Sequence, residues 1–259
     1  MAPPAGARTV ALGPDVHAAW SDASRGDLRP TGAGPADGGP LQRFAGELAA
    51  STHSRVDRVA WVTQVHGSRV RGVRWEPGWE PAAAAGGGEP SGPVPWHLGE
   101  GDALVSTTPG VALCVLTADC APLALASAEG YFGAVHAGWR GLQAGVVEAA
   151  VARLRGRGAT EVVGSLGPCI HAGCYAFGED DLRSVADRYG DTVRGRTSAG
   201  GPALDLPAAV AAALGRSGVP LIEGVDGCTA CGDGWFSHRA RADAGRLALV
   251  VWSSRTGRA

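Results

Sequence analysis

The middle of the chain contains three apolar segments separated only by short breaks, and this pattern constrains the fold more than any other feature. The segments cover residues 111–117, 123–127 and 131–136, and Ala-Glu-Gly at 128–130 forms a natural turn between the last two. Short apolar runs bounded by turn residues are typical of β-strands, so we expect a hairpin here. A helical pattern with one apolar face follows at 142–155 and is stopped by glycines.

Further segments of both kinds lie on either side of this hairpin. Strand-like runs occur at 56–65, 103–106, 161–166 and 246–252, and helical patterns occur at 180–189 and 206–215. Strands adjacent in sequence, mixed with helices, are typical of layered α+β domains rather than of doubly wound folds. We therefore predict an α+β fold with mixed β-sheet layers flanked by helices.

Composition excludes several classes of function. The 259 residues carry a net charge of −2, so nothing supports nucleic-acid binding. The apolar runs are too short and too broken to span a membrane. The N-terminal residues lack the pattern of a signal peptide, so we expect a cytoplasmic protein. The six cysteines are then interpreted as thiols or metal ligands rather than as structural disulfides.

The hairpin predicts two metal ligands on one face. Pairing Ser127 with Tyr131 places Pro122 opposite His136, and Cys120 becomes the diagonal neighbour of His136. Diagonal neighbours lie about 7–8 Å apart, a spacing from which two side chains can reach one ion. Pro122 cannot donate to a strand ladder, so we expect the sheet edge to open beside the site.

His66 follows the apolar run 56–65 and is a plausible third ligand. Two neutral imidazoles and one thiolate would leave a zinc-type ion with one open coordination position, as in catalytic sites. The alternative for Cys120 is a buried small hydrophobe, and for each histidine an ordinary hydrogen-bonding role.

Polar and aromatic residues next to these ligands suggest how a substrate is bound. Arg140 precedes the helix at 142–155, where a guanidinium and free backbone N–H groups could bind phosphate or carboxylate. Trp139 could stack on a planar ring. Alternatively, Arg140 pairs with a surface acid and Trp139 fills the core. Asp119 could be a general acid or base, could orient a ligand histidine, or could cap a turn.

The remaining cysteines and histidines give weaker signals. Cys169 and Cys174 lie in a Gly-rich loop, and Cys228 and Cys231 form a single C-x-x-C. They could form a second metal site, but free thiols in loops are the favoured interpretation. His238 and Arg239 follow an aromatic pair and could line a pocket.

Eight short segments, in family order over about residues 58–252, give the chain a resemblance to the YfiH-type laccase-domain family. This family is described variously as purine nucleoside phosphorylases, peptidoglycan editing factors and polyphenol oxidases. The matching segments are Gln64-Val65-His66-Gly67, Gly101-Asp102-Ala103-Leu104-Val105, Thr117-Ala118-Asp119-Cys120-Ala121-Pro122, His136-Ala137-Gly138-Trp139-Arg140-Gly141, Gly167-Pro168-Cys169-Ile170, Cys228-Thr229, Phe236-Ser237-His238-Arg239 and Gly245-Arg246-Leu247.

The resemblance implies a single YfiH-like domain of the cytotoxic-necrotizing-factor-like fold. It implies that His66, Cys120 and His136 bind zinc, with copper reported for some members. It further implies phosphorolysis of adenosine, inosine and methylthioadenosine, and deamination of adenosine. Two positions depart from the family pattern, Ala176 where a glutamate is usual and Ala240 where a second arginine is frequent. These departures bear on substrate range more than on metal binding.

The segment 76–99 contains three consecutive glycines and five prolines without apolar periodicity. This composition predicts a disordered surface insertion. Because the expected metal ligands lie on both sides of it, we interpret residues 1–259 as one domain.

We therefore expect a zinc-dependent purine nucleoside phosphorylase with adenosine deaminase activity, which acts on a small nucleoside and phosphate as a monomer or weak homo-oligomer. Catalytic roles fall to Asp119, Cys120 and Arg140, and substrate or phosphate binding to Arg140, Trp139, His238 and Arg239. One alternative is a peptidoglycan-precursor hydrolase with Cys120 as nucleophile and His136 as base. Another is a copper-dependent polyphenol oxidase, although the only methionine is Met1. A zinc-stabilised interaction protein without turnover is the non-enzymatic alternative.

Overall fold

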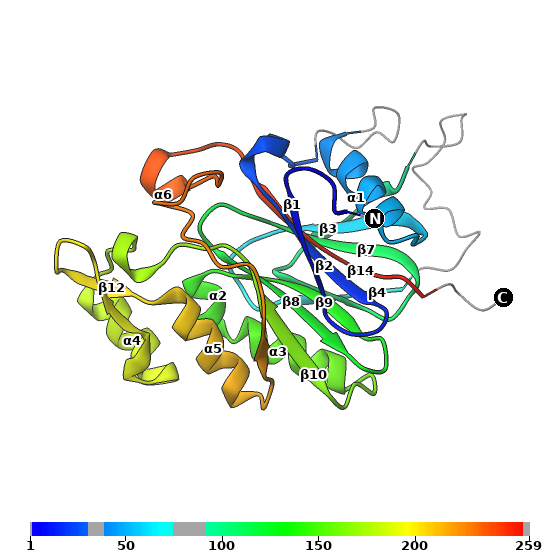
Figure 1. The fold of residues 1–259 in the computed structure, drawn as a ribbon. Helices are drawn as coiled ribbons and strands as arrows, with labels where there is room; N and C mark the ends of the chain where they lie inside the picture. Colours follow the sequence, from blue (N-terminus) through cyan, green and yellow to red (C-terminus); the bar gives the residue numbers. More distant parts are fainter. Residues whose placement is uncertain (1, 31–38, 75–91, 256–259) are drawn as a thin grey trace.

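Two six-stranded β-sheets stack face to face, and helices cover the outer face of each sheet (Figure 1). The computed structural model describes residues 2–30, 39–74 and 92–255. None of the helices in this described part combines the length and apolarity needed to cross a membrane. The architecture confirms the predicted α+β fold with mixed sheet layers.

The first sheet has the strand order β1-β2-β14-β7-β3-β5. Its edge strand β5 pairs in parallel with β3, and β3 pairs in parallel with β7, whereas the other neighbours are antiparallel. Its strands are β1 (Ala7–Ala11), β2 (Val16–Ser21), β3 (Val56–Thr63), β5 (Val94–Glu100), β7 (Gly110–Thr117) and β14 (Leu247–Ser253).

The second sheet has the strand order β13-β10-β8-β9-β6-β4. Its central strands form the predicted hairpin, in which Pro122 pairs with His136. The hydrogen bond from Ser127 N–H to the Tyr131 carbonyl closes the turn as expected. Its strands are β4 (Val70–Val73), β6 (Ala103–Ser106), β8 (Ala121–Ser127), β9 (Phe132–Ala137), β10 (Val162–Leu166) and β13 (Leu221–Ile222), and a separate small ribbon joins β11 (Arg194–Arg196) to β12 (Pro202–Leu204).

The central strands are apolar along their whole length because both of their faces are buried. In β8, Ala124 and Ala126 face the first sheet, whereas Leu123 and Leu125 face the helices on the other side. A strand buried on both faces shows a continuous apolar run instead of a polar–apolar alternation. This explains why these strands were recognisable from their apolar runs and turns alone.

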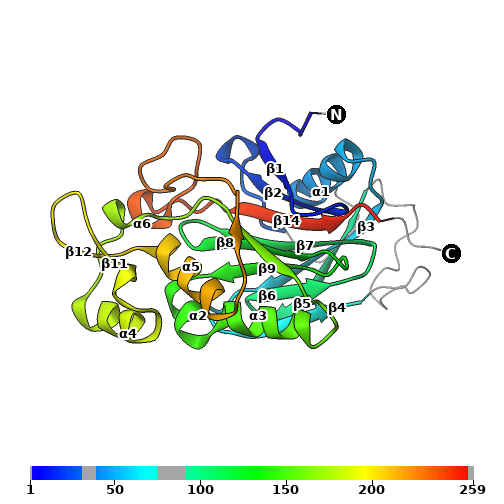
Figure 2. The ribbon, with the colours of Figure 1, turned by 60° about the horizontal axis from the view of Figure 1, so that its bottom comes forward.

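The helices form two unequal outer layers (Figure 2). The helix α1 (Pro40–Ser51) covers the first sheet, where Phe44 and Leu48 pack with Trp252 of β14. The second sheet is covered by α2, α3 and α5, and α4 packs against α2 and α5. These helices are α2 (Trp139–Ala144), α3 (Val146–Arg155), α4 (Glu179–Tyr189) and α5 (Leu206–Arg216); the short α6 (His238–Arg241) follows the aromatic pair Trp235-Phe236.

Two expectations need correction. The helix predicted at 142–155 begins earlier, at Trp139, and is broken at Gly145, whose φ of 84° is left-handed and ends α2. The segment 76–99 was predicted to form no packed element, but residues from Val94 onward form β5, which pairs with β3. The prediction failed there because a neighbouring strand supplies the hydrogen bonds that local composition does not foretell. Residues 76–91 lie outside the described part of the chain.

Candidate metal centre

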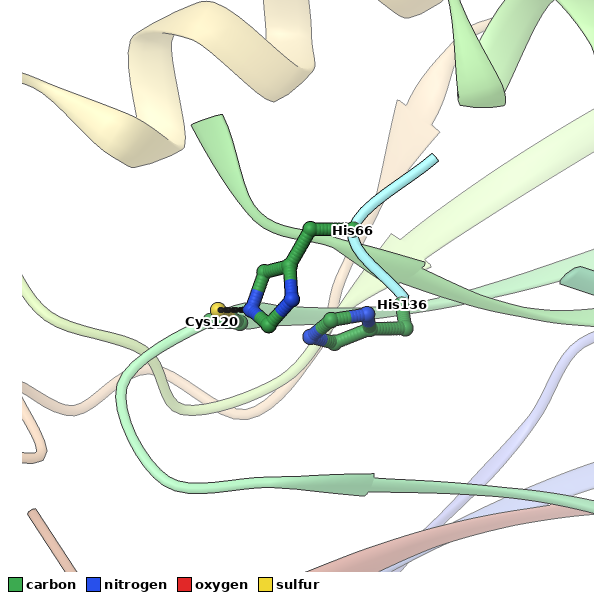
Figure 3. A group of neighbouring side chains, drawn as sticks. All are labelled: His66, Cys120 and His136. Carbon is green, nitrogen blue, oxygen red and sulfur yellow. Dashed lines mark hydrogen bonds between the residues drawn. The ribbon is translucent and has the colours of Figure 1, made fainter. Parts of the chain in front are cut away.

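The three predicted ligands come from three different segments that meet at one end of the β8–β9 hairpin. Cys120 lies immediately before β8, and His136 lies near the end of β9. His66 lies in the loop after β3, so it comes from the other sheet. The side chains of all three point toward one another (Figure 3).

The distances fit a single small cation. One donor atom from each of the three side chains lies within 4.8 Å of the others. The Cys120 Sγ lies 3.8 Å from His66 Nε2, and the two imidazole rings meet edge-on with centroids 4.8 Å apart. In a tetrahedral zinc site, donor atoms are separated by about 3.3–3.6 Å, so a small rotation of the side chains closes the geometry. Thiolate and imidazole are also the donor types that zinc prefers.

Asp102 is the functional residue that sequence reasoning left without a role. Its fully buried carboxylate contacts His136 Nδ1 at 2.9 Å. It also accepts backbone hydrogen bonds from His66 at 2.9 Å and from Gly67 at 2.8 Å. The first contact keeps the proton of His136 on Nδ1 and leaves Nε2 free for a metal. The others hold His66 in its left-handed backbone conformation, with φ of 58°.

A signal for Asp102 was present in the sequence. It stands between Gly101 and the strand Ala103–Ser106, so a carboxylate begins a fully buried strand. A buried carboxylate needs hydrogen-bonding or charged partners, and next to a metal site these partners are the ligands. Burial by itself raises the pKa of Asp102, but the contacts with His136 and the backbone N–H groups hold the pKa below its usual range.

The site favours the thiolate form of Cys120. Burial alone would raise the pKa of this thiol, but the charge of His136 and hydrogen bonds with His136 and His66 lower it to about 6. The same pairing raises the pKa of His136, although burial opposes this. Because metals bind the deprotonated thiol, the ligand set is ready for a cation that takes the place of the imidazolium proton.

A cavity of about 610 Å³ opens directly onto the three ligands. It gives a bound ion access to a further molecule, which a catalytic site needs. All residues predicted for catalysis or substrate binding line this cavity, namely Asp119, Cys120, Trp139, Arg140, His238 and Arg239, together with the ligands His66 and His136. Further lining residues that sequence reasoning did not single out include Arg29, Gln64, Tyr175 and Arg246.

Asp119 connects the metal loop to the opposite wall of the cavity. Its Oδ1 accepts a hydrogen bond from the Thr229 hydroxyl at 2.7 Å, and its Oδ2 accepts one from the Arg239 backbone N–H at 2.6 Å. Its backbone has a left-handed φ of 92°, and its carbonyl accepts the N–H of Ile170. Asp119 therefore links the loop that carries Cys120 to three distant segments, which contain Ile170, Thr229 and Arg239.

The two predicted anion-binding arginines each lie against an aromatic ring. The guanidinium of Arg140 lies 4.4 Å from the centre of the Trp139 ring, and that of Arg239 lies 5.0 Å from the centre of Tyr175. Trp139 also meets Phe177 edge-on, so its ring is part of the packed wall and one of its faces is occupied by Arg140. Stacking restricts the orientation of each guanidinium, and Arg239 also donates to the Ala176 carbonyl at 3.5 Å.

Comparison with known proteins shows which family the chain belongs to. The sequence profile described as multi-copper polyphenol oxidoreductase laccase matches residues 42–254. The chain belongs to this family. The match confirms the predicted YfiH-type laccase-domain resemblance, and it covers all three expected ligands and every strand except β1 and β2.

Several proteins that are similar to this chain are named purine nucleoside phosphorylases. The Mycobacterium tuberculosis protein is 36% identical over 211 residues, which cover 79% of this chain and 76% of the relative. A Streptomyces coelicolor protein is 38% identical, with 80% of both chains covered. A Streptomyces griseus protein is 35% identical over 257 residues, which cover 95% of this chain and 97% of the relative.

Solved structures of the family share the fold. A Neisseria meningitidis protein superposes with a TM-score of 0.69 at 25% identity, covering 96% of this chain and all 100% of its own. The Bacillus licheniformis protein YfiH superposes with a TM-score of 0.69 at 21% identity, with 92% of both chains covered. At that identity the second match supports the fold alone.

Proposed function

We propose that the chain is a zinc-dependent purine nucleoside phosphorylase that also deaminates adenosine. The observation that carries the proposal is the His66–Cys120–His136 cluster, which faces a cavity large enough for a nucleoside and lined by arginines. The names of the relatives support phosphorolysis. We propose adenosine, inosine and methylthioadenosine as substrates, and we expect copper to be able to replace zinc because two imidazoles and a thiolate also suit copper.

Phosphorolysis requires an anion beside the nucleoside, and two arginines suit this task. Arg140 and Arg239 both line the cavity and are held by aromatic rings. A guanidinium binds phosphate through two parallel N–H bonds, which orients one phosphate oxygen toward the ribose. That oxygen forms a bond to C1′ while the bond between C1′ and the purine nitrogen breaks, and the purine leaves after protonation. His238 lines the same cavity and is the candidate contact for the sugar or base.

Deamination requires an activated water and a group that carries protons. A zinc ion held by the three ligands would lower the pKa of a water in its open position. We assign proton transfer to Asp119, which lies next to Cys120 on the cavity wall. The hydrogen bonds from Thr229 and from Arg239 N–H fix its carboxylate in place.

The test uses purified protein, adenosine, and buffers with and without phosphate. We expect adenine and ribose 1-phosphate only when phosphate is present, and inosine under both conditions. The His66→Ala variant should lose both activities, because it removes one ligand of the ion. Metal-loaded protein that forms none of these products would contradict the proposal.

The peptidoglycan-precursor hydrolase is a second candidate, favoured by one observation. The lowered pKa of Cys120, about 6, also suits a nucleophile with His136 as its base. A thiolate bound to a metal is not free to attack, so metal analysis of protein prepared without chelators separates the two. An ion bound at the His66–Cys120–His136 cluster favours the phosphorylase, whereas metal-free protein that cleaves a muropeptide favours the hydrolase.

A copper-dependent oxidase is the third candidate, favoured by the description of the family itself. The sequence offers only Met1 as a thioether ligand. Copper-loaded protein that oxidises a phenol faster than free copper, with strong thiolate-to-copper absorption in the visible range, would favour this function over phosphorolysis.

A further inference from the structure

Three thiols outside the metal centre lie together, although they come from two distant segments. Cys174 ends a short 3₁₀ turn (Ala172–Cys174), and Cys228 and Cys231 form the C-x-x-C. Their Sγ atoms lie within 4.8 Å of one another, and all three thiols are free. Cys169 pairs with Cys228 through the backbone in an isolated bridge, but its thiol does not belong to this group.

The loop around Cys228 is built as a thiolate site. The backbone N–H of His171 donates to Cys228 Sγ at 3.4 Å. The backbone N–H groups of Ala230 and Cys231 also contact this sulfur, and together they lower the pKa of Cys228 although burial opposes them. Burial and the neighbouring thiols Cys231 and Cys228 raise the pKa of Cys174 to about 12, so Cys174 becomes a thiolate only with a cation beside it. The N–H of Gly232 donates to the Cys228 carbonyl at 2.8 Å, which closes the C-x-x-C into a tight turn. Such N–H contacts orient and stabilise a metal-bound thiolate.

We propose that Cys174, Cys228 and Cys231 bind a second zinc ion, separate from the one held by His66, Cys120 and His136. Zinc prefers thiolates, and a C-x-x-C completed by a cysteine from another segment is typical of structural zinc sites. Binding releases the thiol protons. His171 contributes its backbone N–H to Cys228, whereas its imidazole lies beside Asp226, with Nε2 3.7 Å from the carboxylate.

The loop that carries two of the thiols is held in shape by Arg241. The guanidinium of Arg241 donates to the carbonyl groups of Thr229 at 3.1 Å and of Ala230 at 2.9 Å, and its charge is paired with Asp243 at 3.0 Å. Cys228 and Cys231 are therefore carried by a loop that is already ordered without an ion.

The second ion would stabilise the structure around the substrate cavity rather than take part in the reaction. Tyr175 follows Cys174 directly and lines the cavity. Thr229 follows Cys228 directly and donates to Asp119. An ion bound by both Cys174 and Cys228 therefore fixes the distance between Tyr175, which lines the cavity, and Thr229, which holds Asp119. The ion is a positioning element, because none of its ligands lines the cavity.

The stoichiometry of metal binding tests the proposal. Full-length protein purified with reductant and without chelator should contain two zinc ions per chain by mass spectrometry of the elements. The Cys231→Ala variant should contain one, and so should Cys120→Ala, which removes a ligand of the other site. Cys114→Ala is the matched control and should retain two ions, because Cys114 is buried in the core away from both groups.

Cobalt substitution identifies the site that is lost. Cobalt-loaded Cys120→Ala should keep the strong thiolate-to-cobalt absorption of a three-thiolate site, whereas cobalt-loaded Cys231→Ala should lose most of it. Circular dichroism confirms that each variant is folded. This readout is independent of catalysis, so an inactive protein with two ions would overturn the proposed function and leave the second site standing.

Two results would overturn the second site. One is a wild-type protein that binds a single zinc ion, with all six thiols reactive after denaturation, when Cys231→Ala keeps that ion and Cys120→Ala loses it. The other is a disulfide between two of Cys174, Cys228 and Cys231 in protein kept under reductant, found by alkylation and peptide mass spectrometry. In the latter case the three thiols form a redox pair with a spare cysteine instead of a metal site.

Discussion

Asp102 shows how one buried side chain sets the chemistry of a site that it does not enter. Its carboxylate orients His136 through Nδ1 and holds the His66 loop through backbone N–H groups. It therefore acts on two of the three ligands at once, one from each sheet. Residues that hydrogen-bond to metal ligands in this way have a strong effect on metal affinity.

We predict that Asp102→Asn lowers zinc affinity by about 10- to 100-fold. An asparagine keeps only one of the two acceptor oxygens. If its NH₂ group faces His136 Nδ1, it drives the imidazole proton to Nε2, the atom that must bind the metal; if the NH₂ group faces the Gly67 N–H, it breaks a hydrogen bond that holds the His66 loop. Competition with a chromophoric chelator measures the affinity. Asp180→Asn, at an exposed position in α4, is the control and should bind zinc as the wild type does. Unchanged affinity in Asp102→Asn would show that its carboxylate does not set the tautomer.

The role of Asp119 can be separated into positioning and proton transfer by a second pair of variants. Thr229→Val removes one hydrogen bond to the carboxylate but leaves the carboxylate in place. Asp119→Asn removes its ability to carry a proton. We predict that Asp119→Asn lowers kcat for deamination by about 10²- to 10⁴-fold, the usual range for a lost acid or base.

Thr229→Val should cost much less in kcat for deamination, and both variants should retain their zinc. The pH profile of kcat gives the decisive readout, because only a proton carrier shifts it. If both variants lose the same activity with the same pH profile, Asp119 is a positioning residue alone.

The β8–β9 hairpin and the helix after it place the ligands with little spare room. Gly138 lies between β9 and α2, and a Cβ built on it would lie 2.9 Å from His66 Cδ2 and 3.0 Å from Cys120 Sγ. The element junction therefore needs glycine because the two ligands occupy the space of a side chain. The break at Gly145 separates α2 from α3. Trp139 and Arg140 in α2 line the cavity, and after the break α3 changes direction and packs on the second sheet.

We predict that Gly138→Ala weakens zinc binding because the new methyl group displaces His66 or Cys120. Overpacking costs about 1–3 kcal/mol, which corresponds to a loss in affinity of about 5- to 150-fold. Isothermal titration of the metal-free protein with zinc measures this loss. Gly215→Ala is the matched control: its Cβ would meet nothing within 4 Å, and it lies in α5. That variant should bind zinc normally and be slightly more stable, since alanine favours a helix. Normal zinc binding by Gly138→Ala would show that the two ligands can move aside.

In the whole molecule, the metal centre is a link between two sheets. His66 follows a strand of the first sheet, whereas Cys120 and His136 belong to the hairpin of the second. The two sheets also share one buried core, so the ion adds to a contact that already exists. An ion that binds only the folded chain stabilises it by mass action.

We predict that removal of the metal lowers the Tm without unfolding the protein at room temperature. Zinc at 100 times its Kd contributes about 2.7 kcal/mol. For a chain of this size, this corresponds to a Tm shift of about 5–10 °C. Scanning calorimetry of the Cys231→Ala variant, which lacks the second ion, measures the shift before and after dialysis against a chelator, and added zinc should restore the Tm. A protein that unfolds outright on chelation would instead favour a structural role for the ion.

The amino-acid sequence was sufficient to predict the strands that are buried on both faces, the register of the hairpin and the convergence of His66, Cys120 and His136. These features depend on local signals: continuous apolar runs, a turn at Ala128-Glu129-Gly130, and a cysteine one residue from the strand that pairs with His136. Local propensity and pairing geometry are sufficient for each of them. The strands β1, β2 and β5 escaped prediction because β2 and β5 also pair with strands far along the chain, and β1 depends on β2.

The folded chain, by contrast, brings together polar residues that no local pattern connects. It joins Asp102 to two of the candidate ligands, links Asp119 to Thr229 and Arg239, and brings Cys174 to the C-x-x-C. These contacts join residues that are 34 to 120 positions apart, as with Asp102 and His136 or Asp119 and Arg239. Burial is what makes such contacts matter: a carboxylate removed from water requires partners, and only the folded chain determines which residues are close enough to supply them.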